Sequence, residues 1–127
     1  MNGSFDPRQA LIIVRAQITG PLGVQEVQLA LDTGATTTVV RTSVLSILGY
    51  DLTTVADHAT MLTGSGIESV PRLRVQQIET LGKKRRGFPV IAHTLPPNAP
   101  IDGLLGLDFL RRKRLTIDFE RGRITLT

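Results

Sequence analysis

The sequence predicts a mostly β, barrel-like domain with one or two short helices. Short apolar runs built from Val, Ile and Leu recur along the 127 residues, and turns rich in Gly and Pro separate them. Hydrophobic residues make up 41% of the chain and charged residues 20%, a balance typical of a globular protein and not of a disordered one. We expect residues 1–10 to form an N-terminal tail and residues 11–127 to form a single domain.

The first half of the chain predicts a hairpin, an acidic turn and one helical segment. Each strand is an apolar run that stops at turn-forming residues. Thr42 is a suitable N-cap for the helical segment, and Gly49 is a suitable stop. The expected elements are a strand from Leu11 to about Thr19, the turn Gly20–Gly23, a strand over Val24–Leu31, β-forming residues over Thr36–Val40 and a short helix or turn over Arg41–Leu48.

The second half predicts three pairs of strands and one further helix. Glycines mark the turns, and prolines stiffen one loop. The expected elements are strands on both sides of Thr63–Gly66, a second pair around a turn at Gly82–Gly87, a loop over Pro96–Pro100, a helix from Leu107 to about Lys113 and a last hairpin joining Leu115–Phe119 to Arg123–Leu126.

The tetrapeptide Asp32-Thr33-Gly34-Ala35 is the first candidate for chemistry. It follows an apolar strand directly, so the carboxylate of Asp32 sits at the tip of a strand–loop–strand unit. Gly34 allows another backbone or a substrate to approach closely. The ordinary alternative is a β-turn whose Asp caps a backbone N–H group.

Two later segments favour a catalytic role for that motif. Met61–Ile67 has a glycine-rich tip between apolar residues, and Ile101–Leu110 contains Leu104-Leu105-Gly106 before a helix. Together with Asp32–Ala35, this ordered trio resembles the retropepsins, the single-domain homodimeric aspartic proteases of retroviruses and their cellular and bacterial relatives. The resemblance runs from about Leu11 to Phe119. It implies a closed, barrel-like acid-protease fold in which Met61–Ile67 is the flap hairpin.

The resemblance implies an aspartic endopeptidase, whose mechanism requires two carboxylates close together. The chain has no second Asp-(Thr/Ser)-Gly, because Asp102-Gly103 lacks the intervening hydroxyl residue. We therefore expect a homodimer in which Asp32 of each copy is catalytic. Thr33 and Gly34 are implied as supporting residues of the active-site loops. The implied contacts with a polypeptide substrate are Gly34, Ala35, Thr36, Gly64, Ser65, Gly66 and Ile101.

The chain departs from many retroviral members in two places. Those proteins carry charged residues at the positions of Thr36 and Leu107, where the charges pair near the dimer interface. Here both are replaced together, so neither charge is left unpaired, and we expect a weaker dimer. In addition, retroviral chains tend to end near the position of Phe119, whereas residues 120–127 here add a turn and a strand. The construction of the interface is left open.

Three other functions compete with this one. A phosphoaspartyl transferase also has an Asp after a strand, but the hairpin-rich pattern disfavours its doubly wound fold. Nucleic-acid binding would suit the net charge of +4 and the basic runs Lys83–Arg86 and Arg111–Arg114, but there is one Tyr, four Phe and no reader motif. The third is a catalytically weak or silent dimeric module that binds peptides. We do not expect nucleic acid as the partner.

The remaining composition limits the chemistry. The absence of Cys excludes disulfides, thiol catalysis and Cys-ligated zinc, and neither His58 nor His93 lies in a recognisable motif. We expect no metal and no cofactor. No apolar stretch approaches the roughly 20 residues of a membrane span, and Met1–Gln9 lacks an apolar signal core, so we expect a soluble, cytoplasmic protein.

Overall fold

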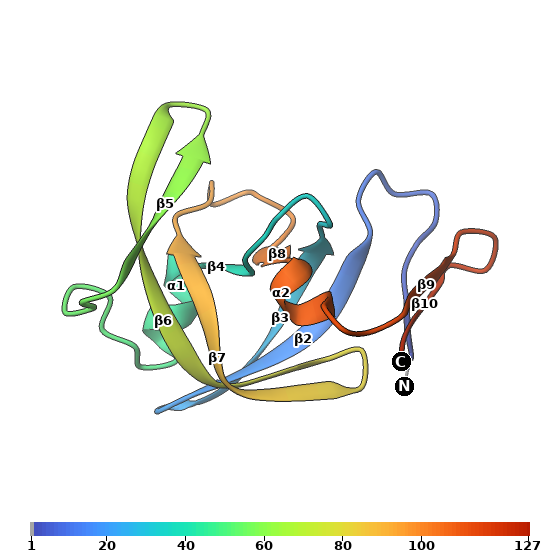
Figure 1. Cartoon of the computed structure of the whole chain (residues 1–127), viewed down its shortest axis with the longest axis horizontal. Coiled ribbons are helices and arrows are strands. Elements are labelled where there is room, and N and C mark those ends of the chain that lie inside the picture. The colour runs from blue at the N-terminus through green and yellow to red at the C-terminus, as the bar shows by residue number, and fades with distance from the viewer. Residues whose placement is uncertain (1) are drawn as a thin grey trace.

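Six strands close into a barrel in the computed structural model, which describes residues 2–127 (Figure 1). The order around the barrel is β2 (Ile13–Gly20), β3 (Gly23–Leu31), β8 (Gly103–Leu105), β4 (Val39–Arg41), β7 (Lys83–His93) and β6 (Gly66–Thr80). Antiparallel pairing of β2 with β6 closes the barrel. The pairs β3–β8 and β4–β7 are parallel, whereas the other neighbours are antiparallel. The predicted mostly β barrel is confirmed.

The other elements lie outside this barrel. Strand β5 (His58–Thr63) pairs with the first part of β6 to form a long hairpin that projects from the barrel (Figure 1). A separate three-stranded sheet contains both ends of the described chain, in the order β1 (Asn2–Ser4), β10 (Arg123–Leu126) and β9 (Leu115–Asp118). The helices are α1 (Thr42–Ile47) and α2 (Leu107–Leu110). Among residues 2–127, no helix is long and apolar enough to cross a membrane.

The core is aliphatic, as the scarcity of aromatic residues predicts. Strand β2 alternates strictly, because Val14, Ala16 and Ile18 are buried and the residues between them face outward. Phe109 of α2 is fully buried and contacts the ring of Phe88 edge to face, with 5.7 Å between the ring centroids. A second, smaller cluster has Val39, Val70 and Ile91 at its centre and includes Ala59, Met61 and Leu104.

One turn differs from the expectation. The chain turns between β6 and β7 at Leu81-Gly82, and not over Gly82–Gly87, so the basic residues Lys83–Arg86 belong to β7. Leu81 and Gly82 have φ values of 53° and 75°, the left-handed pair of a tight two-residue hairpin turn. Leu81 is only 6% exposed, and burial of its side chain in the core favours this register.

Both helices also differ in detail from the expectation. The N-cap of α1 is Arg41, which makes no side-chain capping bond, and Thr42 is already the first helical residue. Gly49 follows the helix with φ of 95°, as expected of a stop. Helix α2 ends at Leu110 and not near Lys113, because Arg111 is extended and Arg112 has a positive φ of 64° as the chain turns toward β9.

The expected N-terminal tail contains a strand. Gly3 of β1 lies opposite Ile124 of β10, and the backbone N–H of Phe5 donates to the carbonyl of Gly122 at 2.8 Å. Residues 2–4 therefore belong to the three-stranded sheet and are not a free extension. The expectation missed them because Asn, Gly and Ser are poor strand formers, and only pairing with β10 selects the extended conformation.

Candidate active site

Asp32 lies immediately after β3, at the start of the loop that leads to β4. Its backbone N–H donates to the carbonyl of Leu105 in β8 at 3.0 Å, so the parallel β3–β8 pair extends up to Asp32 itself. One carboxylate oxygen, Oδ1, accepts from the N–H of Gly34 at 2.9 Å. Among residues 2–127, no hydrogen bond or ion pair reaches Oδ2. The side chain is half-buried, with one oxygen fixed and the other open.

The loop is held from behind by the start of α2. Leu107 donates its N–H to the carbonyl of Ala35 at 2.8 Å. The carboxylate of Asp108 accepts from the N–H of Thr38 at 3.0 Å and from its hydroxyl at 2.7 Å. The Thr38 hydroxyl in turn accepts from the N–H of Gly106 at 3.1 Å. We call these contacts the Thr38–Asp108 clamp, and Thr38 is fully buried within it.

Two glycines allow the strands and the loop to come this close. A Cβ atom on Gly106 would lie 2.8 Å from the carbonyl oxygen of Ala35. A Cβ atom on Gly103 would overlap the carbonyl oxygen of Val39. The glycine of the Leu104-Leu105-Gly106 unit is therefore required by backbone packing against the Asp32 loop, which explains why the two motifs occur together.

The loop residues expected to contact substrate differ in their exposure and in whether their backbone groups are already hydrogen-bonded within the chain. Thr33, Gly34 and Thr36 are exposed. Ala35 uses both backbone groups inside the chain, since its N–H donates to the carbonyl of Asp32 at 3.1 Å and its carbonyl accepts from Leu107. Within the described residues, the carbonyl of Gly34 has no such partner, so it is one of the acceptors that the loop offers to another molecule.

At the glycine-rich tip expected at Gly64–Gly66, Gly64 and Ser65 form a two-residue turn between β5 and β6, and Gly66 is the first residue of β6. Gly66 has φ of 120°, and the Thr63 hydroxyl donates to its carbonyl at 3.0 Å. Leu62 and Ile67 lie opposite each other beside the turn and are 81% and 75% exposed. Sequence reasoning did not name these two as site residues, although apolar residues flanking a glycine-rich tip were the available signal. They give the tip an apolar surface.

A bidentate ion pair fastens the base of this hairpin. Arg72 of β6 donates to Asp57, with 2.9 Å between Nε and Oδ2 and 3.3 Å between a terminal nitrogen and Oδ1. The hydrogen bonds from Arg72 lower the pKa of the Asp57 carboxyl below its ordinary value. The backbone N–H of Arg72 also donates to the Asp57 carbonyl at 3.0 Å.

The structure thus joins some of the predicted site residues and leaves others apart. Asp32, Gly34 and Ala35 are connected by hydrogen bonds, and Leu105 and Gly106 support them. Within residues 2–127, no hydrogen bond links the hairpin tip or Ile101 to the Asp32 loop. In Figure 1 the hairpin, the segment between β7 and β8 and the Asp32 loop all reach toward the upper side of the barrel.

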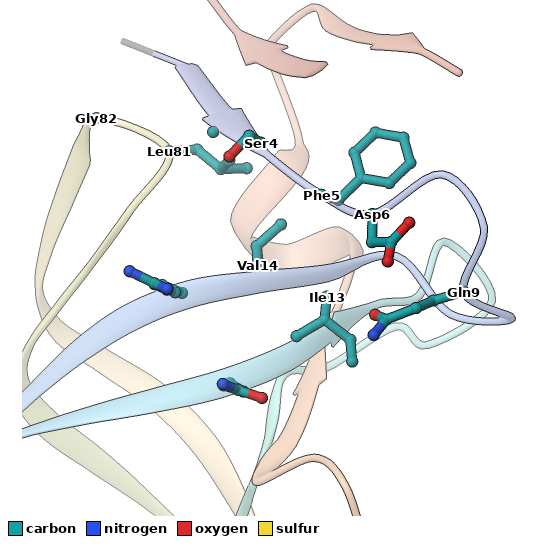
Figure 2. A pocket seen from close by; sticks show the side chains of 11 residues that line it. Ser4, Phe5, Asp6, Gln9, Ile13, Val14, Leu81 and Gly82 are labelled. Atoms are coloured by element: carbon teal, nitrogen blue, oxygen red, sulfur yellow. The ribbon is translucent and has the colours of Figure 1, made fainter. Parts of the chain in front are cut away.

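Two cavities of the described chain are not lined by Asp32. One of about 610 Å³ is lined by Thr37 and Asp108 together with Asp57 and Arg72. Another, of about 570 Å³, lies between the N-terminal segment and β2 (Figure 2). Asp6 lines this second cavity, but its carboxylate already accepts from the N–H of Arg8 at 2.9 Å, which lowers its pKa.

One residue of the first basic run, Arg85, contacts helix α2. The guanidinium of Arg85 donates to the carbonyl of Phe109 at 3.0 Å and lies over the Phe109 ring, 5.0 Å from its centroid. Arg85 therefore has a packing role. Among residues 2–127, no group of three or more His, Asp or Glu side chains is arranged to hold a metal ion.

Comparison with known proteins agrees with this geometry. A family model described as aspartyl protease matches residues 14–109, which include the Asp32 loop, the hairpin and α2 up to Phe109. The chain is similar in structure to a retropepsin-like aspartic protease from Rickettsia conorii, with a TM-score of 0.73, 21% sequence identity, and coverage of 99% of this chain and 88% of that chain. No curated protein sequence matches significantly. The expected retropepsin-like fold is confirmed.

Proposed function

Since this chain belongs to the aspartyl protease family, we propose that it is an aspartic endopeptidase that uses Asp32 from each of two copies. The observation that supports the proposal most directly is how the two carboxylate oxygens of Asp32 are hydrogen-bonded. One oxygen is fixed by Gly34, the other has no partner within residues 2–127, and the loop is immobilised by the Thr38–Asp108 clamp. A carboxylate held in this way is suited to proton transfer and not to structural pairing.

The reaction follows from two such carboxylates in contact. Two like charges at short range disfavour double ionisation, so the pair shares one proton. The ionised Asp32 takes a proton from a water molecule, whose oxygen attacks the peptide carbonyl carbon. The protonated Asp32 of the other copy gives its proton to the carbonyl oxygen. The tetrahedral intermediate then collapses, the C–N bond breaks, and the leaving nitrogen receives a proton from the pair.

A second copy of the chain is the proposed source of the other carboxylate. Asp102, in the one Asp-Gly dipeptide of the sequence, is bonded to the backbone of Gln28 and faces Arg41, so it is not available as a partner. Thr33 and Gly34 are exposed on the same loop and would meet their symmetry mates across the two-fold axis. We place this protease domain at residues 11–127, with β1 contributing to its terminal sheet.

We propose that a peptide substrate lies extended between the Asp32 loop and the β5–β6 hairpin. The Gly34 carbonyl would accept from the substrate backbone, and Thr36 and Ala35 would line the same edge. The backbone of Gly64, Ser65 and Gly66 would pair with the peptide as an added strand. Ile101 would contact a substrate side chain. The exposed apolar side chains of Leu62 and Ile67 support this role for the hairpin, since closure over a peptide would bury them.

The decisive experiment is cleavage of a peptide library by the purified chain, with and without pepstatin. Asp32→Asn should abolish cleavage while leaving the fold intact, because an amide cannot act as the base or share the proton. Glu26→Gln is the matched control, since it removes an exposed carboxylate on β3 whose nearest cation lies 3.9 Å away. Near-parental cleavage by Asp32→Asn, after contaminating proteases are excluded, would refute the assignment. Peptide binding without cleavage by the parent would instead identify a catalytically silent module.

A further inference from the structure

Arg41 at the end of β4 reaches across to the segment that joins β7 to β8. One terminal nitrogen of its guanidinium donates to the carbonyl of Ile101 at 2.7 Å and approaches the carbonyl of Ala99 at 3.4 Å. Its Nε lies 3.8 Å from Oδ1 of Asp102. Its backbone N–H donates to the Asp102 carbonyl at 2.7 Å. The side chain of Arg41 is only 16% exposed.

Asp102 is fixed from its other side by β3. Its N–H donates to the carbonyl of Gln28 at 2.7 Å, and its Oδ2 accepts from the N–H of Gln28 at 2.8 Å. Asp102 thus connects β3, the start of β8 and, through Arg41, β4. We call the contacts of Arg41 with Ala99, Ile101 and Asp102 the Arg41–Asp102 lock. Removal of one partner of such a half-buried pair leaves a charge without compensation.

The lock holds a segment that has few bonds of its own. Residues 94–101 contain Pro96, Pro97 and Pro100, which cannot donate, and the one internal backbone bond found there runs from Ala99 to Pro96 at 2.9 Å. The guanidinium of Arg41 therefore supplies the main polar anchor of this segment in the described chain. One terminal nitrogen of the guanidinium faces both carbonyls while Nε faces Asp102, and a lysine has only one nitrogen for these two sides.

The locked segment borders the proposed cleft. It lies on the same upper side of the barrel as the Asp32 loop and the hairpin (Figure 1). It leads through Asp102 and Gly103 to Leu104, which packs in the small apolar cluster with Val39 and with Met61 of the hairpin. A shift of residues 99–102 would thus be passed on to Leu104 and to the apolar cluster that includes Met61 of the hairpin.

We infer that Arg41 is a positioning residue that fixes residues 94–101 as a selectivity wall, so that the enzyme discriminates among substrate side chains that meet Ile101 and Leu104. The inference rests on the proposed function. Arg41 does not touch the reacting atoms. It fixes the position of residues 94–101. If this segment could move, the enzyme would accept substrate side chains of different sizes.

The test measures selectivity in variants of Arg41. Arg41→Gln removes the charge, and Arg41→Lys keeps the charge but has no second nitrogen to face Asp102. Arg15→Gln is the control, since the side chain of Arg15 is 82% exposed. Peptides that vary at one position at a time are assayed for kcat/KM. We expect discrimination between the best and the worst side chain to fall about tenfold in both Arg41 variants. Hydrogen exchange should rise at residues 99–102 and stay unchanged at Asp32.

A purely structural role would give a different pattern. In that case all peptides would lose kcat/KM by the same factor, or exchange would rise without any change in selectivity, and either result would overturn the inference. The same library is also tested for binding to Asp32→Asn, with and without Arg41→Gln. If the parent does not cleave but Asp32→Asn binds selectively, the proposed catalysis fails and the selectivity wall is still tested. If Asp32→Asn binds no peptide and the parent cleaves none, both fail.

Discussion

At the scale of single residues, the candidate site depends most on a threonine that takes no part in the chemistry. Thr38 donates through its hydroxyl to Asp108, accepts from Gly106, and donates through its N–H to the same carboxylate. Its carbonyl accepts from Ile91 of β7 at 2.9 Å. Every polar group of the buried Thr38 is thereby hydrogen-bonded, and these bonds fix the end of the Asp32 loop.

We predict that Thr38→Val destabilises the fold and lowers activity. The substitution keeps the shape but removes the hydroxyl, so the buried N–H of Gly106 loses its acceptor and Asp108 loses a donor. A loss of about 2–3 kcal/mol in the free energy of unfolding is expected. Thr38→Ser keeps the hydroxyl and should retain most of the stability and of kcat. Urea denaturation and peptide cleavage check both variants, and equal behaviour of Val and Ser would show that the hydroxyl is dispensable.

The candidate catalytic residue Asp32 can be proposed from the sequence alone, but the contacts that hold its loop cannot. Asp32-Thr33-Gly34-Ala35 is a local motif, so it can be recognised without the fold. Thr38 and Asp108 are 70 positions apart, and each has an ordinary local explanation as a β-former and a helix-start acid. Only the parallel pairing of β3 with β8 brings α2 behind the Asp32 loop. Arg41 and Asp102 are linked in the same non-local way.

At the scale of elements, the sequence predicts the strands well and their ends less well. Apolar alternation and glycine turns locate the hairpins around Pro21 and Ser65. The sequence predicts the turn between β6 and β7 too late, because burial of Leu81 overrides the preference of a non-glycine residue for negative φ. Helix α2 is shorter than its composition suggests, because the chain must turn at Arg112 to form β9.

The β5–β6 hairpin should loosen at low pH through Asp57. The folded-state pKa of this carboxyl is lowered from 3.8 by hydrogen bonds from Arg72, so the pair stabilises the hairpin above that value and the effect is lost as the pH falls through the lowered value. We expect the Asp57 carboxyl signal in NMR to titrate below the ordinary Asp range. Hydrogen exchange in β5 should increase in Asp57→Asn at neutral pH. An unshifted titration would show that the pair does not form in solution.

At the scale of the whole molecule, each chain supplies one candidate catalytic carboxylate, Asp32, so the proposed mechanism requires a homodimer. We predict that specific activity falls on dilution, because separation of the copies leaves isolated Asp32 residues without a partner. Thr36 and Leu107 stand where charged residues pair in many retroviral relatives, so the fall should begin at a higher concentration than in those proteins. Activity and sedimentation measured over the same dilution series check this. Constant specific activity down to low nanomolar protein would mean a tight dimer or an active monomer.

The same pairing predicts a bell-shaped dependence of kcat/KM on pH, with its maximum in mildly acidic solution. At low pH both Asp32 carboxyls are protonated and neither can take a proton from water; at high pH both are ionised and neither can protonate the substrate carbonyl. The two limbs describe the pair and not either residue alone. The profile should persist with chelators and in His58→Ala and His93→Ala, because neither histidine has a role in proton transfer here. It should be measured at protein concentrations where the dimer is intact, so that dissociation does not imitate a titration. A profile that rises through neutrality and collapses with a chelator would indicate metal-assisted hydrolysis, and the shared-proton mechanism would then have to be abandoned.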